Sequence, residues 1–265
     1  LKIISNHGVG YDNVDVKTAL SIKSSPIVVT HTPDVVSDAT ADVAFTLMLN
    51  ASRKSRIFEE RLRQVKWKSG LETVLGNDLR GKTLGIIGMG SIGKKVAQRA
   101  IGFGMKIVYY QRNQNLEFEK NLNTAGQTLD ELLVQSDVIS VNTPLTESTR
   151  HLLSKAQFDK MKPNCLVINT ARGAVINEKD LVEALKNKKI AGCGLDVFEF
   201  EPKITEELLE LAKENPNISL LPHIGTQTVE TRVDMERLCL VNLENYLTLK
   251  KNPLTPVPEH KHLFQ

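Results

Sequence analysis

A glycine-rich stretch, Thr83–Arg99 (TLGIIGMGSIGKKVAQR), constrains the fold of this chain more than any other feature. A short apolar run leads into the turn GMGSIG, and a helical pattern follows it. This order predicts a strand, a tight turn and a helix: Gly88 permits the turn, Gly90 admits a pyrophosphate close to the backbone, and Gly93 lets the helix pack on the strand. The N–H groups at the helix N-terminus suit phosphates. A glycine turn alone needs no ligand, so the flanking strand and helix are what favour dinucleotide binding.

The composition excludes several other classes of function. The chain has 265 residues, of which 41% are hydrophobic and 25% charged, as in a globular protein of one or two domains. A net charge of +3 is too balanced to indicate a nucleic-acid or membrane-surface partner. No membrane-spanning run or signal peptide is visible. The three cysteines are odd in number and far apart, which predicts reduced thiols in a cytoplasmic protein and no metal site.

Strands and helices alternate along most of the chain. From Lys82 onward this alternation predicts a doubly wound parallel sheet with helices on both faces. Before it, the runs Leu1–Ser5 and Pro26–Thr30 predict two strands of one βαβ unit. Long helical patterns from Ser37 to about Trp67 and from Thr226 to about Lys250 would connect two domains. We expect a nucleotide-binding domain over 41–231 and a second domain formed by 1–40 and 232–265.

Three polar side chains follow three different predicted strands. Arg172 comes after CLVIN, Glu199 and Glu201 come after GCGLDV, and His223 comes after ISLL. Ligands of open parallel sheets bind beyond the carboxyl ends of the strands, so these groups are expected to meet at one edge. Each residue alone is more often structural than catalytic. Their convergence beside a dinucleotide turn indicates an active site.

Five stretches together resemble one family, the D-isomer-specific 2-hydroxyacid dehydrogenases. They are HGVGYDNVD (7–15), LGIIGMGSIG (84–93), NTARGAVINEKDLVEAL (169–185), GLDVFEFEP (194–202) and LPHIGTQT (221–228). The resemblance implies a Rossmann-type nucleotide domain and a flavodoxin-like substrate domain, commonly in a homodimer. Members of that family have a βα-rich stretch before HGVGYDNVD. We therefore expect an N-terminal portion to be missing and the substrate domain (1–40 and 232–265) to be partial.

The resemblance also implies roles for the polar residues. Arg172 would hold the carboxylate and carbonyl of a 2-oxoacid, since a guanidinium matches two oxygens and keeps its charge. His223 would be the general acid for carbonyl reduction, and Glu201 would favour its protonated form. Glu199 is the rival carboxylate, but the family's glutamate directly precedes the proline. The backbone at Val9 and Gly10 would bind the substrate carboxylate.

The residues after the second strand of the nucleotide domain point to the cofactor. NAD enzymes usually have an acid there to hold the ribose 2′-hydroxyl, but this chain has Gln111, Arg112 and Asn113. An arginine that suits a 2′-phosphate predicts preference for NADP without exclusion of NAD, although Arg112 could also simply be solvated. The further cofactor contacts expected are Gly88, Gly90, Ser91, Ile92, Gly93, Thr143, Pro144, Thr170, Ala171, Asp196 (at the nicotinamide amide) and Gly225.

With Gln-Arg after that strand, the chain is most similar to the glyoxylate/hydroxypyruvate reductase branch. This implies an NADP(H)-preferring oxidoreductase that reduces a small 2-oxoacid, glyoxylate or hydroxypyruvate, to the D-2-hydroxyacid. The alternative is a nucleotide-sensing corepressor on the same fold, because such relatives can keep the Arg/Glu/His set. Formate dehydrogenase relatives are a third possibility, but they require Gln where Glu201 stands.

Overall fold

The chain divides into two compact units. The computed structural model describes residues 1–22, 26–66, 74–112, 119, 124 and 126–264. One unit combines Leu1–Ala39 with Thr226–Gln265, and the other is Thr40–Gly225. The sequence predicts the nucleotide-binding domain over 41–231, so its first boundary lies one residue later, and its second six residues later, than in the structure.

The larger unit is built on a parallel sheet. Among the described residues its six strands have the order β4-β3-β5-β6-β7-β8. The strands are β3 (Thr83–Ile87), β4 (Lys106–Tyr110), β5 (Val138–Val141), β6 (Leu166–Asn169), β7 (Gly192–Leu195) and β8 (Ile218–Leu220). The chain goes from β3 to β4 on one side and then crosses to β5 on the other. The strand order therefore reverses between β3 and β5, which is where open sheets of this kind bind their ligands. The doubly wound parallel sheet expected from the sequence is confirmed.

The register of the strands aligns their carboxyl ends. Ile87 is paired with both Tyr110 and Val141, Val141 with Asn169, and Asn169 with Leu195. The residue that follows each of these strands therefore lies in one row along the same edge of the sheet. This row contains the glycine turn and the segments that begin at positions 111, 142, 170 and 196.

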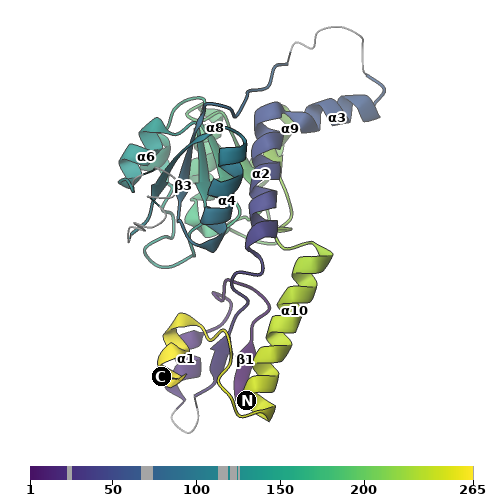
Figure 1. Ribbon diagram of the computed structural model, residues 1–265. Coiled ribbons are helices and arrows are strands. Elements are labelled where there is room, and N and C mark those ends of the chain that lie inside the picture. The colour runs from purple at the N-terminus through teal and green to yellow at the C-terminus, as the bar shows by residue number, and fades with distance from the viewer. Residues whose placement is uncertain (23–25, 67–73, 113–118, 120–123, 125, 265) are drawn as a thin grey trace. The chain divides into compact units, whose positions relative to one another are not determined.

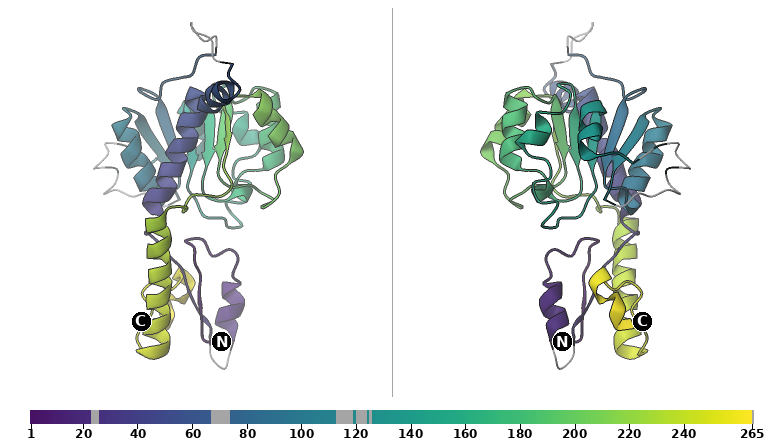
Figure 2. Two further views of the ribbon diagram at one scale, coloured as in Figure 1. Left: turned by 90° about the vertical axis from the view of Figure 1, so that its right-hand side faces the viewer. Right: turned by 90° about the vertical axis from the view of Figure 1, so that its left-hand side faces the viewer.

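Two layers of helices cover the sheet (Figures 1 and 2). On one face, α2 (Ser37–Arg53) and α4 (Ser91–Gly102) bury alanines and larger apolar side chains against β3, β5 and β6. The other face packs against α6 (Leu129–Gln135), α7 (Lys155–Phe158), α8 (Glu178–Lys186) and α9 (Glu206–Glu214). Because both faces are covered, the strands are continuous apolar runs rather than alternating ones.

The prediction of a single helix from Ser37 to about Trp67 is wrong. Lys54 has a left-handed backbone, with φ of 56°, and this ends α2 and starts the separate helix α3 (Ser55–Arg63). A non-glycine residue in this conformation cannot continue a right-handed helix. None of the α3 residues is buried, whereas α2 is buried along much of its length. Trp67 lies outside the described residues.

The smaller unit contains the predicted βαβ arrangement. β1 (Ile3–Ser5) pairs in parallel with β2 (Val28–Thr30), α1 (Val16–Ser21) connects them, and α10 (Val229–Leu243) packs against β1. The long final helix is shorter than expected, since a π-helical turn (η2, Glu244–Thr248) follows α10. The chain ends in a 3₁₀ helix (η3, Pro258–Phe264). Its buried His260 accepts a hydrogen bond at Nδ1 from the Val29 N–H.

Candidate active site

The glycine turn contains two crowded glycines and one open one. Gly88 has φ of +93°, and a Cβ there would lie 2.8 Å from the Asn142 carbonyl oxygen and 3.0 Å from the Thr143 nitrogen. A Cβ at Gly93 would lie 2.1 Å from the Gly88 carbonyl oxygen, whereas one at Gly90 would meet nothing within 4 Å. Gly88 and Gly93 are therefore required by packing, and Gly90 faces open space.

The helix that follows this turn begins at Ser91. Ser91 and Ile92 form its first turn together with Gly93, and the N–H groups of a first helical turn have no acceptor within the helix. The helix dipole places partial positive charge at the same end. The turn and the start of α4 therefore form a corner, at the reversal of strand order, whose backbone charge suits an anion.

One side chain just after β4 contacts the glycine turn. The Oε1 atom of Gln111 accepts a hydrogen bond from the Met89 N–H at 3.0 Å. Arg112 is exposed, and Asn113 lies outside the described residues. Position 111 thus brings an amide to this corner and an arginine follows it, and neither side chain has the negative charge that would repel a 2′-phosphate.

Two buried polar atoms at the strand ends suit a bound cofactor. Within the described part of the chain, Thr170 Oγ1 and Asn142 Oδ1 are buried and have no hydrogen-bond partner. Unpaired buried polar groups are costly, and ligands often satisfy them. A nicotinamide cofactor brings amide and hydroxyl groups that can do so, so the residues present fit this group. Pro144 follows the same strand as Asn142, and its carbonyl oxygen accepts a hydrogen bond from a threonine hydroxyl.

Asn169 sets the path of the loop after β6. Its Oδ1 accepts from the Ala171 N–H and its Nδ2 donates to the Arg172 carbonyl oxygen, both at 3.0 Å. Arg172 is partly buried, and its Nη1 donates to the Ala171 carbonyl oxygen at 2.8 Å. One asparagine side chain therefore fixes the backbone of the segment that contains the predicted substrate-binding arginine.

Glu201 and His223 form a hydrogen-bonded pair. His223 Nδ1 lies 2.9 Å from Glu201 Oε2, and the other oxygen, Oε1, accepts from the Phe198 N–H at 2.9 Å. Because a carboxylate only accepts, Nδ1 is the donor and Nε2 is the nitrogen left to exchange a proton with a substrate. The His223 side chain is 51% exposed, so that nitrogen is accessible in the larger unit.

Asp196 holds the turn that presents His223. Its two carboxylate oxygens accept from the N–H groups of Ile224 and Gly225, each at 2.8 Å, and its carbonyl oxygen accepts from His223 N–H at 2.8 Å. These bonds support the left-handed backbone of His223, whose φ is 53°. Burial raises the pKa of the Asp196 carboxyl even though the amide hydrogen bonds oppose this. From the sequence, Asp196 is expected at the nicotinamide amide; its bonds to this turn are a second role that the sequence does not predict.

Glu199, the rival carboxylate, is bonded elsewhere. Its Oε1 lies 2.6 Å from Nε2 of His151, which the sequence analysis did not single out. Its Oε2 accepts from the N–H of Glu178, which sequence reasoning also missed. The only sequence signal for a role of Glu178 is its position as the first residue of a helix. Glu199 thus pairs with His151, and Glu201 pairs with His223.

The loop at Val9 and Gly10 belongs to the smaller unit, and side chains of that unit shape it. Asn6 Nδ2 lies within hydrogen-bond distance of the carbonyl oxygens of Gly8 (3.1 Å) and Gly10 (2.9 Å). His31 Nδ1 bonds to the Val9 carbonyl oxygen at 2.9 Å. The backbone of this loop is therefore constrained. Its role in binding a carboxylate stays a prediction.

Other kinds of site have no support. Over the described ranges, no group of His, Cys, Asp and Glu is arranged to hold a metal ion. Burial raises the pKa of the Cys165 and Cys193 thiols to about 12 each, so neither is a nucleophile at neutral pH. The helices that the structure describes include none with the length and apolar character needed to cross a membrane.

Comparison with known proteins identifies the family. Residues 45–225 match the family model described as D-isomer specific 2-hydroxyacid dehydrogenase, NAD binding domain. The chain is 46% identical over 264 residues to 4-methyl-2-oxopentanoate reductase A of Aspergillus oryzae, a match that covers 100% of this chain and 77% of that protein. The crystal structure of a glyoxylate reductase from Paecilomyes thermophila has a TM-score of 0.89 at 46% identity, covering 98% of this chain and 76% of that one.

A second solved structure has the same TM-score at a lower sequence identity. The NADPH-dependent glyoxylate/hydroxypyruvate reductase of Sinorhizobium meliloti, in complex with NADP and malonate, has a TM-score of 0.89 at 39% identity. The match covers 98% of this chain and 78% of that one. Given the family model over most of the chain and these identities, the chain belongs to the D-isomer-specific 2-hydroxyacid dehydrogenase family.

Proposed function

We propose that this protein is an NADP(H)-preferring reductase of a small 2-oxoacid, glyoxylate or hydroxypyruvate, and that it forms the D-2-hydroxyacid. The hydrogen bond between Glu201 and His223, on the sheet edge where Arg172 also lies, is the observation that supports this most. The relatives reported above are named reductases of 2-oxoacids, which agrees with it. No observation favours the corepressor alternative.

The proton is the part of the reaction that this chain supplies. Glu201 accepts from Nδ1 of His223 and so directs a proton on Nε2 toward the substrate carbonyl oxygen. The Arg172 guanidinium would bind the substrate carboxylate and carbonyl oxygen, with the Val9–Gly10 backbone as a second contact for the carboxylate. Bound NADPH would supply the hydride.

The cofactor would lie along the strand ends of the larger unit. Gly88, Gly90 and Gly93, with Ser91 and Ile92, would hold the pyrophosphate. Gln111, Arg112 and Asn113 would meet the 2′-phosphate, and the nicotinamide end would contact Thr143, Pro144, Thr170, Ala171, Asp196 and Gly225. A charged hydrogen bond of ~1.5–3 kcal/mol from Arg112 corresponds to a roughly 10- to 100-fold preference for NADPH over NADH. The NADP complex of the Sinorhizobium meliloti relative supports this choice.

We further propose a cytoplasmic homodimer. The three cysteines are free thiols and two of them are buried, as is common where disulfides do not form. The helix α3, none of whose residues is buried, supports a subunit interface there.

The test follows NADPH and NADH absorbance with glyoxylate and hydroxypyruvate. We expect kcat/KM to be higher with NADPH, and His223→Asn to lower kcat by ~10²–10⁴-fold because the proton donor is lost. Arg112→Ala should reduce the preference for NADPH, while Arg80→Ala serves as a matched control on the same unit. A clear preference for NADH would refute the cofactor assignment. Full activity of His223→Asn would refute the role of the pair.

A further inference from the structure

A second histidine–carboxylate pair lies two residues from the catalytic one. Glu201 bonds to His223, and Glu199 on the same loop bonds to His151, with 2.6 Å between Oε1 and Nε2. The Glu199 side chain is only 11% exposed, compared with 35% for Glu201. A carboxylate withdrawn from water to this degree needs several hydrogen-bond donors.

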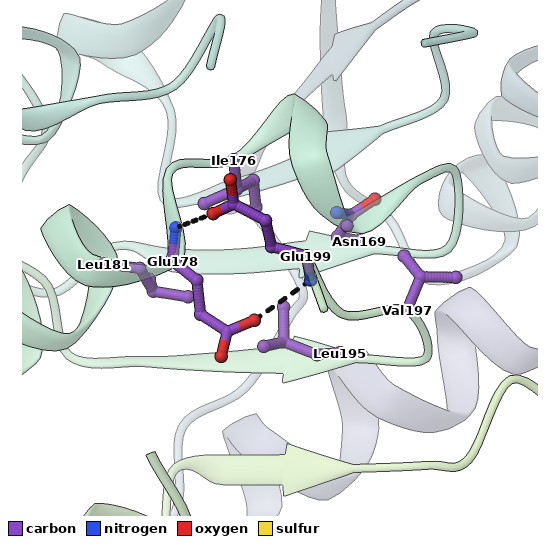
Figure 3. A pocket seen from close by; sticks show the side chains of 8 residues that line it. Asn169, Ile176, Glu178, Leu181, Leu195, Val197 and Glu199 are labelled. Atoms are coloured by element: carbon purple, nitrogen blue, oxygen red, sulfur yellow. Dashed lines mark hydrogen bonds between the residues drawn. The ribbon is translucent and has the colours of Figure 1, made fainter. Parts of the chain in front are cut away.

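Glu178 supplies the rest of the support through a reciprocal arrangement (Figure 3). The N–H of Glu178 donates to Glu199 Oε2 and the N–H of Glu199 donates to Glu178 Oε2, both at 3.0 Å. The remaining oxygen of Glu178 accepts from the Thr205 hydroxyl at 2.8 Å. Glu178 is the first residue of α8, where the N–H has no acceptor within the helix and the dipole favours negative charge. We call this arrangement the Glu178–Glu199 pair.

The Glu178–Glu199 pair fixes the segment that positions the catalytic carboxylate. Glu201 Oε1 accepts from the Phe198 N–H, so a displacement at Phe198 or Glu199 moves the Glu201 side chain as well. The same segment lies directly against Gly173, because a Cβ there would be 1.9 Å from the Phe198 carbonyl carbon and 2.4 Å from the Glu199 nitrogen. Gly173 follows Arg172. The Glu178–Glu199 pair therefore restrains the segment that contains Glu201, the partner of the proposed proton donor, and contacts the segment that contains the proposed substrate-binding Arg172.

The loop after β5, which contains His151, is hydrogen-bonded to the same two segments. The N–H of His151 donates to the Ala174 carbonyl oxygen at 2.8 Å while its ring bonds to Glu199. The segments that follow β5, β6 and β7 are thus connected through the partly buried carboxylate of Glu199. The cavity lined by Glu178, Glu199 and their apolar neighbours measures about 10 Å³, which is room for no more than about one water molecule. It is too small for a 2-oxoacid, so the pair does not bind the substrate.

We infer that Glu199, held by Glu178 and His151, is a positioning residue for Glu201 and Arg172. This inference rests on the proposed function, because it assumes that those two residues act on the substrate. Catalytic groups tolerate little displacement, and a misplacement of about 1 Å can cost about 100-fold in rate. Five hydrogen bonds to the two carboxylates restrain the loop.

The test compares Glu199→Ala with Glu199→Gln in the full chain. The glutamine keeps an oxygen that accepts from the Glu178 N–H, and its amide group can donate to His151 Nε2, whereas the alanine removes both contacts. Glu210→Ala, which removes an exposed carboxylate on the same unit, is the matched control. The measurements are kcat and KM with hydroxypyruvate, the Kd of NADPH, the melting temperature, and the distance between Glu201 and His223 in a crystal structure of the alanine variant.

We expect kcat of Glu199→Ala to fall by about 100-fold, with the Kd of NADPH within about threefold of the wild-type value. Glu199→Gln should recover most of kcat, and the Glu201–His223 hydrogen bond should be broken in the alanine variant. A lower melting temperature with kcat unchanged would overturn the inference and show a structural role alone. A glutamine variant as slow as the alanine variant would also overturn it, because charge rather than position would then be responsible.

Failure of the proposed function gives a different result. An inactive wild-type protein, or an active His223→Asn variant, would overturn the proposed function and with it this inference. An active wild-type protein with an inactive His223→Asn variant and a fully active Glu199→Ala variant would overturn the inference alone.

Discussion

The glycine turn allows binding and folding to be separated by two substitutions three residues apart. At Gly90 the backbone has φ of −77°, which alanine adopts readily, and a Cβ meets nothing within 4 Å. Gly90→Ala removes chain entropy from the unfolded state, worth ~0.4–1 kcal/mol, and loses part of the N-cap preference of glycine, so the two effects nearly cancel. We therefore expect the free energy of unfolding to change by less than about 1 kcal/mol.

The cofactor should respond differently to the same methyl group. If the Gly90 backbone approaches the pyrophosphate, the methyl group displaces it and costs a charged hydrogen bond of ~1.5–3 kcal/mol, which raises the Kd of NADPH roughly 10- to 100-fold. At Gly93 the added Cβ would lie 2.1 Å from the Gly88 carbonyl oxygen, so the turn itself must move. Such overpacking costs about 1–3 kcal/mol of stability.

Chemical unfolding monitored by circular dichroism gives the free energies for the two variants, and cofactor fluorescence gives the Kd. We expect the Gly90→Ala variant to be stable and to bind NADPH weakly, and the Gly93→Ala variant to be destabilised. A Gly90→Ala variant that binds NADPH like the wild type would refute the phosphate-binding role of the turn. A Gly90→Ala variant as unstable as Gly93→Ala would refute the packing argument.

Two further predictions concern stability. Burial alone would raise the pKa of Asp137, but hydrogen bonds from the Thr83 N–H and Lys162 outweigh it and lower the pKa below its ordinary value of 3.8. Asp137→Asn should therefore cost about 1 kcal/mol at neutral pH, and the difference from wild type should shrink as the pH falls below about 4, measured by urea unfolding at several pH values. In the smaller unit, the side-chain oxygen of the buried Asn242 accepts hydrogen bonds from the N–H groups of Leu254 and Thr255. Asn242→Leu should therefore lower the free energy of unfolding by about 2 kcal/mol and increase hydrogen exchange at both amides. Unchanged exchange would contradict this.

Much of the fold could be predicted because it depends on local patterns. The apolar run, the glycines and the helix after Thr83 are close in sequence, and a strand, turn and helix in this order have one common arrangement. The regular alternation of strands and helices then implies a parallel sheet, since parallel strands need crossover helices. The carboxyl ends of such strands share an edge, so the order of residues along the chain was enough to place Arg172, Glu201 and His223 in segments that follow strands of one sheet.

Features that depend on a single backbone angle or on distant side chains could not be predicted. The left-handed Lys54 divides a helix that periodicity alone reads as continuous, because charged residues give no periodic signal for a break. The bonds of Glu199 to His151 and Glu178 connect positions 48 and 21 residues apart, and either glutamate could have paired with His223 by sequence. The sequence by itself determined the parallel sheet and the residue types at its edge, because these follow from local patterns. Only the tertiary structure decided which carboxylate faces which histidine, because that choice depends on the paths of three loops packed together in space.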